Sequence, residues 1–152
     1  MSNQLKIRFK RLVDDKEFPL PARAHGTDAG MDLRSAEPTF IIEPGEVRKV
    51  NTGFAISWDK RDVGKAAFIF PRSGLATKFG IVLANSVGVV DYGYTGPLIA
   101  AIRNDGKKPF LISYKDRIVQ LVFMPVLLID AVEVGSVNET ARGAGGFGST
   151  GS

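Results

Sequence analysis

Short runs of β-branched and aromatic residues, each bounded by Gly, Pro, Asn or Asp, are the feature that most constrains this chain. Helical periodicity is nearly absent. The only helix candidate is brief, residues 73–78, and follows Pro71. The candidate strands are residues 5–9, 39–42, 52–58, 66–70, 98–102, 118–123 and 129–134. Many short strands separated by turn signals predict an all-β sandwich or barrel.

The composition excludes several classes of site. The 152 residues suit one domain, and a hydrophobic content of 44% is enough for a core. The chain has no cysteine, which excludes disulfides, thiolate metal sites and a cysteine nucleophile. Its longest apolar runs are too short to span a bilayer, and its first ten residues lack a signal-peptide pattern. We therefore expect a cytoplasmic protein, or one in the host-cell interior if it is viral, with no membrane partner.

The formal net charge is +4, and it leaves the partner open between nucleic acid and a small phosphate ester. The lysines and arginines are scattered. No block of them is interleaved with aromatic residues, as a platform for single-stranded nucleic acid requires. We therefore expect no stable nucleic-acid partner.

Two segments carry candidate site residues with competing interpretations. Arg72 and Ser73 precede or open the helix candidate, where backbone N–H groups can bind phosphate, but taken alone the segment fits an ordinary N-cap better. Asp91 ends an apolar run and begins a turn, so it is either a turn residue or a functional carboxylate. Asp32 is a second carboxylate among small and apolar residues. Trp58, at the end of a candidate strand, is expected in the core or at its rim.

The last eleven residues, 142–152, hold five of the seventeen glycines. Such a segment has almost nothing to bury, so we predict a domain of residues 1–141 followed by a flexible tail of residues 142–152. A plain linker does not need the arginine at position 142 or the phenylalanine at position 147. These two residues favour a flap that closes over an anionic, planar ligand.

Five segments together resemble the trimeric dUTP diphosphatase (dUTPase) family. They are Ala-Gly-Met-Asp-Leu at 29–33, Pro-Arg-Ser-Gly-Leu-Ala at 71–76, Gly-Val-Val-Asp-x-x-Tyr-x-Gly at 88–96, Asp-Arg-Ile-Val-Gln-Leu at 116–121 and Arg-Gly-x-Gly-Gly-Phe-Gly-Ser-Thr-Gly at 142–151. The family's five motifs occur in this order and at similar spacing, and the resemblance covers nearly the whole chain.

The resemblance implies an all-β, dUTPase-like barrel or jelly roll with one short helix, assembled as a homotrimer whose active sites are shared between subunits. It implies Mg²⁺-dependent hydrolysis of dUTP to dUMP and pyrophosphate by attack of water on the α-phosphate. That reaction limits uracil incorporation into DNA and supplies dUMP for dTTP synthesis. Asp91 matches the carboxylate that deprotonates the water, and an aspartate is ionised at neutral pH. Asp32 matches a residue near the Mg²⁺, acting through water rather than as a direct ligand.

The remaining site residues are also carried over by the resemblance. Asn85, with the hairpin that includes Val90, matches the uracil pocket, and Tyr94 matches the ring that excludes a ribose 2′-hydroxyl. Phe147 matches the tail aromatic that stacks on uracil, and Arg142 the tail arginine that acts on the phosphates in catalysis. The residues that match the phosphate-binding shell are Arg72, Ser73, Gly74, Arg117, Gln120, Gly148 and Ser149.

The sequence departs from the family pattern at Gly93, Pro97 and Lys115, none of which has a chemical role. Three rival functions agree less well with the residues. A dCTP deaminase, which has a related fold, would need a glutamate where this chain has Ala101. A catalytically inactive binding module would be favoured by loss of Asp91, and an oligonucleotide-binding barrel would not explain the tail.

Overall fold

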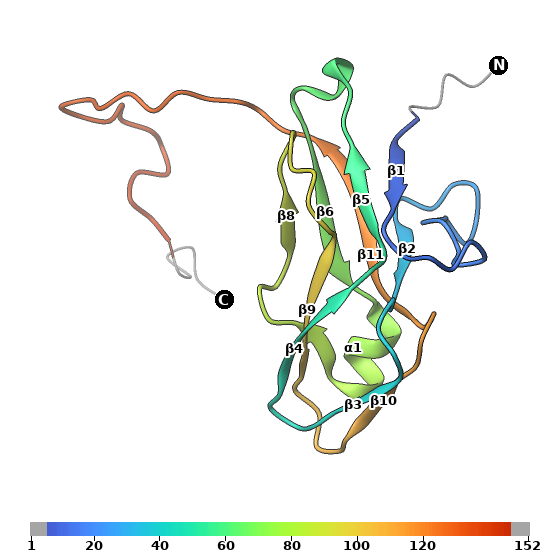
Figure 1. Cartoon of the computed structure of the whole chain (residues 1–152). Coiled ribbons are helices and arrows are strands. Elements are labelled where there is room, and N and C mark those ends of the chain that lie inside the picture. Colours follow the sequence, from blue (N-terminus) through green and yellow to red (C-terminus); the bar gives the residue numbers. More distant parts are fainter. Residues whose placement is uncertain (1–5, 147–152) are drawn as a thin grey trace.

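The computed structural model describes residues 6–146, and its body is built from short strands with one α-helix (Figure 1). The strands are β1 (Arg8–Arg11), β2 (Met31–Arg34), β3 (Phe40–Ile42), β4 (Val47–Asn51), β5 (Phe54–Ser57), β6 (Lys65–Pro71), β7 (Ile81–Leu83), β8 (Gly88–Val90), β9 (Ile99–Asn104), β10 (Phe110–Ile112) and β11 (Arg117–Pro125). The helices are the 3₁₀ helix η1 (Lys60–Asp62) and α1 (Ser73–Phe79). The predicted all-β class with one short helix is confirmed.

The strands form four antiparallel sheets that share one core. The largest has the order β2-β11-β6-β8, a second has the order β4-β9-β7, and two ribbons pair β1 with β5 and β3 with β10. Alternate residues of these strands point inward, as the burial of β9 shows, because successive strand side chains face opposite sides. The core contains Leu33, Ile42, Val50, Ile56, Ile69, Ile102, Ile118 and Leu121, all fully buried.

The predicted elements lie close to the observed ones in the middle of the chain. The candidates at 39–42, 52–58, 66–70, 98–102 and 118–123 correspond to β3, β5, β6, β9 and β11, and the helix candidate to α1. The first candidate is displaced, because β1 begins at Arg8 and pairs with β5 through Arg11. Within the described residues no helix is long and apolar enough to cross a membrane.

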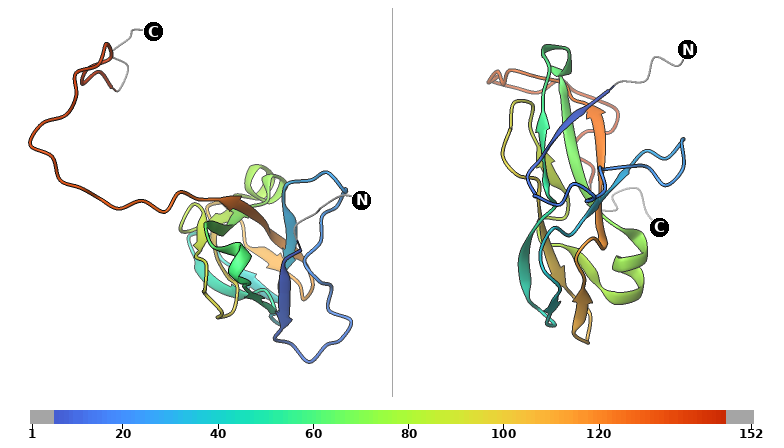
Figure 2. Two further views of the ribbon diagram at one scale, coloured as in Figure 1. Left: turned by 90° about the horizontal axis from the view of Figure 1, so that it is seen from above. Right: turned by 45° about the vertical axis from the view of Figure 1, so that its right-hand side comes forward.

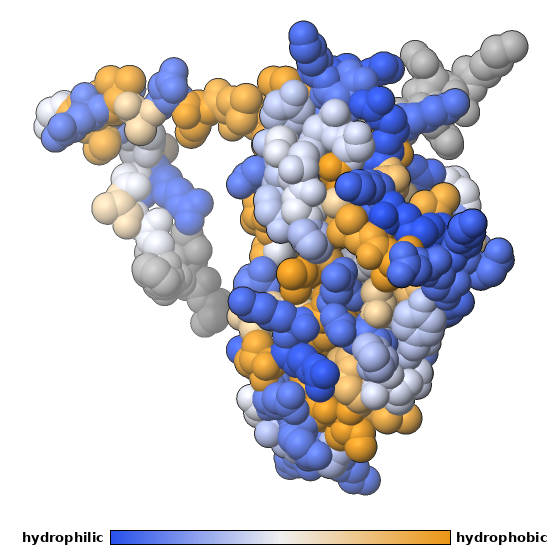
Figure 3. All heavy atoms as spheres, viewed as in Figure 1, coloured by the Kyte–Doolittle hydropathy of each residue, from blue (hydrophilic) through white to orange (hydrophobic). Residues whose placement is uncertain are grey.

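The predicted strand at 129–134 is wrong. After β11 the chain leaves the body as an extended arm, residues 126–146, which forms no strand within the part of the chain that is described (Figure 2). The arm's apolar side chains are exposed: Leu127 by 90%, Ile129 by 83% and Val132 by 82%. Figure 3 shows several apolar patches along the arm, which stands clear of the body. A strand needs hydrogen-bonding neighbours, and within residues 6–146 the arm's backbone bonds to the body only at its start, where the N–H of Val126 donates to the carbonyl of Gly64 at 2.8 Å.

Candidate active site

The register of the largest sheet brings three motifs together. Gln120 on β11 lies opposite Asp32 on β2 on one side and opposite Phe70 on β6 on the other. One residue earlier, Val119 lies opposite Pro71, the last residue of β6. Residues opposite one another in an antiparallel ladder have Cα atoms about 5 Å apart. The ladder therefore gathers Asp32, Gln120 and the start of α1 at one end of the sheet.

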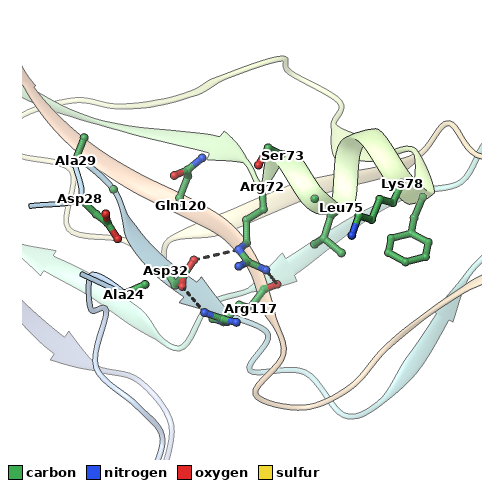
Figure 4. Close-up of a pocket in the computed structure, with 13 residues that line it drawn as sticks. Ala24, Asp28, Ala29, Asp32, Arg72, Ser73, Leu75, Lys78, Arg117 and Gln120 are labelled. Atoms are coloured by element: carbon green, nitrogen blue, oxygen red, sulfur yellow. Dashed lines mark hydrogen bonds and ion pairs between the residues drawn. The ribbon is translucent and has the colours of Figure 1, made fainter. Parts of the chain in front are cut away.

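A single carboxylate holds two arginines at this end of the sheet (Figure 4). Asp32 Oδ1 lies 3.1 Å from Nε of Arg72, and its Oδ2 accepts a hydrogen bond of 3.2 Å from a terminal nitrogen of Arg117. Arg72 also donates to the backbone carbonyl of Arg117 at 3.3 Å. Charge-assisted bonds of this kind are among the stronger side-chain interactions. The two guanidinium groups are thus fixed side by side.

Gln120 is fixed by a close approach to the backbone. Its Nε2 donates to the carbonyl of Pro71 at 3.1 Å, which ties β11 to the start of α1. A Cβ atom added to Gly30 would lie only 2.7 Å from Oε1 of Gln120. Glycine at position 30 therefore leaves the space that the Gln120 amide occupies.

Ser73 is the first residue of α1, and the helix cap is Arg72 in an extended conformation, with no side-chain capping bond. The alternative that Ser73 is an ordinary N-cap is therefore wrong. Instead Ser73, with Gly74, lines a cavity beside the two arginines (Figure 4).

We call this cavity the basic cavity, and its volume is about 570 Å³. It is lined by three cationic side chains, Arg72, Lys78 and Arg117, against two carboxylates, Asp28 and Asp32, so its net charge is positive. The backbone N–H of His25 lowers the pKa of the Asp28 carboxyl. Asp28 and Lys78 belong to no motif, so sequence reasoning missed them. A polar, positively charged cavity of this kind suits an anionic ligand.

A second cavity has a volume of about 190 Å³ and lies along β8 and the start of β9. We call it the hairpin cavity after the hairpin that the resemblance implies, although in the structure β8 pairs with β6 and not with its neighbours in the chain. Its lining includes Asn85, the backbone from Gly88 to Asp91, Tyr94 and Pro97. Ile69 packs against Gly88, and Val90 is buried. The cavity is small, and most of its lining side chains are apolar, as in many small-molecule sites.

Asp91 stands at the mouth of the hairpin cavity and is exposed. Its carboxylate makes no hydrogen bond to any other residue between 6 and 146. Two other aspartates show what a structural role looks like: Asp15 accepts from the N–H of Glu17 at 2.9 Å, and Asp59, the N-cap of η1, accepts from that of Arg61 at 3.2 Å. The side chain of Asp91 is therefore not used to build its turn, which favours the functional interpretation over the structural one.

The turn after Asp91 shapes the position of Tyr94. Gly93 has a φ of +88°, a left-handed conformation that glycine adopts without strain. The Tyr94 hydroxyl donates to the carbonyl of Pro97 at 3.1 Å. A Cβ atom on Gly96 would lie 2.5 Å from that hydroxyl oxygen, so Gly96 lets the ring fold back over the chain. Tyr94 thereby lines the hairpin cavity.

The described part of the tail, residues 142–146, lines neither cavity. Within it, Nε of Arg142 donates to the carbonyl of Gly145 at 3.2 Å. Phe147, Gly148 and Ser149 lie outside the described residues. Between residues 6 and 146 no three His, Asp or Glu side chains cluster in a way that could hold a metal ion. The predicted roles of the tail remain predictions.

Known proteins are similar to this chain in sequence and in fold. The family model for dUTPase matches residues 16–151. Deoxyuridine 5'-triphosphate nucleotidohydrolase of Desulfitobacterium hafniense is 44% identical over 150 residues, which cover 98% of this chain and 98% of that protein. The protein of the same name from Coxiella burnetii is 49% identical over 151 residues, 99% and 97% of the two chains.

The chain belongs to the dUTPase family. Among solved structures, the dUTPase of Staphylococcus bacteriophage 80alpha, determined with dUPNHPP, superposes with a TM-score of 0.86. It is 29% identical, and the match covers 98% of this chain and 100% of the phage protein. The jelly-roll-like β fold expected from the motifs is thus that of the family.

One departure from the family motifs has a visible physical basis. Lys115, where the dUTPase motif usually has glycine, has a φ of +70°, the region that glycine tolerates best. Its Nζ forms an ion pair with Asp15 at 2.7 Å, and its backbone N–H donates to the carbonyl of Ser35 at 2.8 Å. These contacts offset the cost of the conformation. This dUTPase therefore keeps the turn without the glycine.

Proposed function

We propose that this protein is a dUTP diphosphatase that hydrolyses dUTP to dUMP and pyrophosphate. Two cavities carry the proposal. The basic cavity is built on Asp32, Arg72 and Arg117. The hairpin cavity is lined by Asp91, whose carboxylate bonds to no other described residue. The activity limits uracil incorporation into DNA and supplies dUMP for dTTP synthesis. We place the protein in the cytoplasm, or in the host-cell interior if it is viral.

The basic cavity binds the phosphates. Arg72 and Arg117, held by Asp32, present fixed positive charge, and Ser73 adds a hydroxyl donor. Gln120 braces the β6–α1 junction through its bond to Pro71. Phosphoryl transfer depends on positioning and charge neutralisation more than on covalent help from the protein. This is the kind of support that a rigid arginine pair supplies.

The hairpin cavity binds the uracil and the sugar. Backbone groups from Gly88 to Asp91 and the amide of Asn85 line it, so they can pair with the edge of the base. The ring of Tyr94, folded back over Gly96, closes the side where a ribose would carry its 2′-hydroxyl. A site built to hydrogen-bond one base rejects a mismatched base by about 10⁴–10⁵. We therefore expect strong selection against dCTP through the base and against UTP through the sugar.

Asp91 acts as the general base. It takes a proton from water, and the water oxygen forms a bond to the α-phosphorus. The bond between the α-phosphorus and the oxygen bridging to the β-phosphorus breaks, and pyrophosphate leaves with the electron pair. The free carboxylate of Asp91 suits this role because no other bond between residues 6 and 146 competes for it.

Mg²⁺ is the cofactor expected at the phosphates, and the donor set fits a mainly water-bound ion. Both oxygens of Asp32 already face arginines, so Asp32 would hold the ion through water, with Asp28 in the same cavity. Mg²⁺ characteristically keeps several waters and binds through few carboxylates together with substrate phosphates. When bound it neutralises phosphate charge.

The active unit is a homotrimer with shared sites. The basic and hairpin cavities have no lining residue in common, and the arm exposes a run of apolar side chains that a partner subunit would cover. The tail then reaches a neighbouring site, where Arg142 meets the phosphates, Phe147 covers the uracil, and Gly148 and Ser149 add hydrogen bonds.

A deaminase is the nearest alternative and is not supported. Ala101, where deamination needs a glutamate, lies on β9 and offers only a methyl group and a backbone carbonyl, which accepts from Ala84 at 2.8 Å.

Pyrophosphate release from dUTP, dCTP, dTTP and UTP tests the proposed function. We expect rapid release from dUTP and little from the other three nucleotides. Release of single phosphate, or equal rates on dCTP, would overturn it.

A further inference from the structure

Trp58, the only tryptophan in the chain, lies outside all five motifs and touches the turn that carries Asp91 and Tyr94. It follows β5 and precedes η1. Its indole Nε1–H donates to the backbone carbonyl of Tyr94 at 2.7 Å. Its ring meets Tyr92 edge-on, with centroids 5.7 Å apart and planes at 66°. It also meets Phe123 of β11 edge-on, with centroids 6.1 Å apart and planes at 70°.

The turn has few other attachments. The strand pairing of β8 ends at Val90. The next backbone hydrogen bond to another segment is that of Leu98, whose N–H donates to the carbonyl of Phe54. Between them the N–H of Tyr94 bonds to Asp91 and its hydroxyl to Pro97, both within the turn. Among the described residues, the bond from Trp58 is the one hydrogen bond that ties residues 91–97 to another segment. Residues 91–95 are themselves exposed and so gain little from packing.

The indole is suited to this role because it combines a large apolar body with a single N–H donor. The ring contacts Tyr92 and Phe123 of β11, while the donor bonds to the Tyr94 carbonyl. A phenylalanine would keep most of the ring contact and lose the bond. A leucine would lose both.

We propose that Trp58 is a positioning residue for sugar selection: it anchors the 91–96 turn so that the Tyr94 ring stays against the hairpin cavity. This inference rests on the proposed function, in which Tyr94 excludes the 2′-hydroxyl. Without the hydrogen bond from Trp58, the turn moves and the Tyr94 ring leaves its position against the hairpin cavity. A ribonucleotide then fits better, and the deoxyribonucleotide is held less well.

The first test compares Trp58→Phe with the wild-type protein and with Phe9→Leu as a control. Phe9 is a partly buried aromatic on β1 that contacts Phe54 edge-on at 6.2 Å and lies outside both cavities. The assay measures kcat/KM for dUTP and, at high enzyme concentration, for UTP. We expect the dUTP-to-UTP ratio of Trp58→Phe to fall about tenfold, the size of one lost hydrogen bond. We expect Phe9→Leu to keep the wild-type ratio.

The second test does not depend on activity. Hydrogen exchange of the Tyr94 backbone amide, which bonds to the carbonyl of Asp91 within the turn, should speed up about tenfold in Trp58→Phe and remain unchanged in Phe9→Leu. If the wild-type protein fails to hydrolyse dUTP, the proposed function is wrong. The exchange measurement still tests whether Trp58 holds the turn in place. Equal exchange in the two variants would overturn the anchor. Faster exchange with an unchanged dUTP-to-UTP ratio would overturn the link to sugar selection.

Discussion

Asp91→Asn should abolish most turnover while leaving the folded protein intact. The carboxylate is exposed and bonds to no other described residue, and the amide has nearly the same shape. Surface substitutions of this kind change stability by no more than about 0.5 kcal/mol. For a chain of this length that corresponds to a shift in Tm of about 2 °C or less. Loss of a general base lowers kcat by about 10²–10⁴.

Steady-state pyrophosphate release and thermal unfolding should be measured on the same preparations. The control is Asp14→Asn, which neutralises another exposed aspartate that lies outside both cavities. We expect the control to behave like the wild-type protein in both assays, and the affinity of Asp91→Asn for a non-hydrolysable dUTP analogue to stay within about threefold. Turnover above one tenth of the wild-type rate would show that Asp91 is only a turn residue.

Three further changes test other parts of the structure. Deleting residues 142–152 should lower kcat by about 10³ while leaving Tm unchanged, because the segment has little to bury; near-normal turnover would make the tail a mere linker. Gly30→Ala should displace the amide of Gln120, whose Oε1 would lie 2.7 Å from the new Cβ, and raise KM for dUTP; an unchanged KM would show that this contact is not needed. The hydrogen bond from Lys115 lowers the pKa of Asp15 below its ordinary value of 3.8. The pair therefore stabilises the fold above that value and less as the pH falls through the lowered pKa. Tm of the wild-type protein should exceed that of Asp15→Asn at pH 7 and converge with it near pH 2, and a constant difference would refute the assignment.

The sequence predicts the fold class because its central strands are strongly apolar and bounded by turn residues. Residues 66–70 are an example, and they lie within β6. Strands with charged residues are harder to find. β4 contains Arg48 and Lys49 and buries only Val50, so its pattern gives little signal. The segment 129–134 is apolar enough for a strand, yet pairing depends on a neighbour that the sequence alone does not locate.

The candidate site is predictable to the extent that its residues lie in motifs. Motif spacing selects Asp32, Arg72 and Arg117, but only the strand register shows that one carboxylate holds both arginines. Asp28 reaches the basic cavity from a loop, and its neighbours in the sequence give no hint of this. Trp58 contacts Tyr94 through folding alone, since the two residues are far apart in the chain.

Hydrolysis of dUTP in ¹⁸O-enriched water, with mass analysis of both products, tests the proposed reaction most directly. If Asp91 holds the water that attacks the α-phosphorus, the oxygen of that water must end in the new phosphate oxygen of dUMP. We predict one ¹⁸O atom per dUMP and none in pyrophosphate. Label in pyrophosphate, or formation of dUDP with labelled or unlabelled phosphate, would contradict both the position of the attack and the arrangement of the two cavities around it.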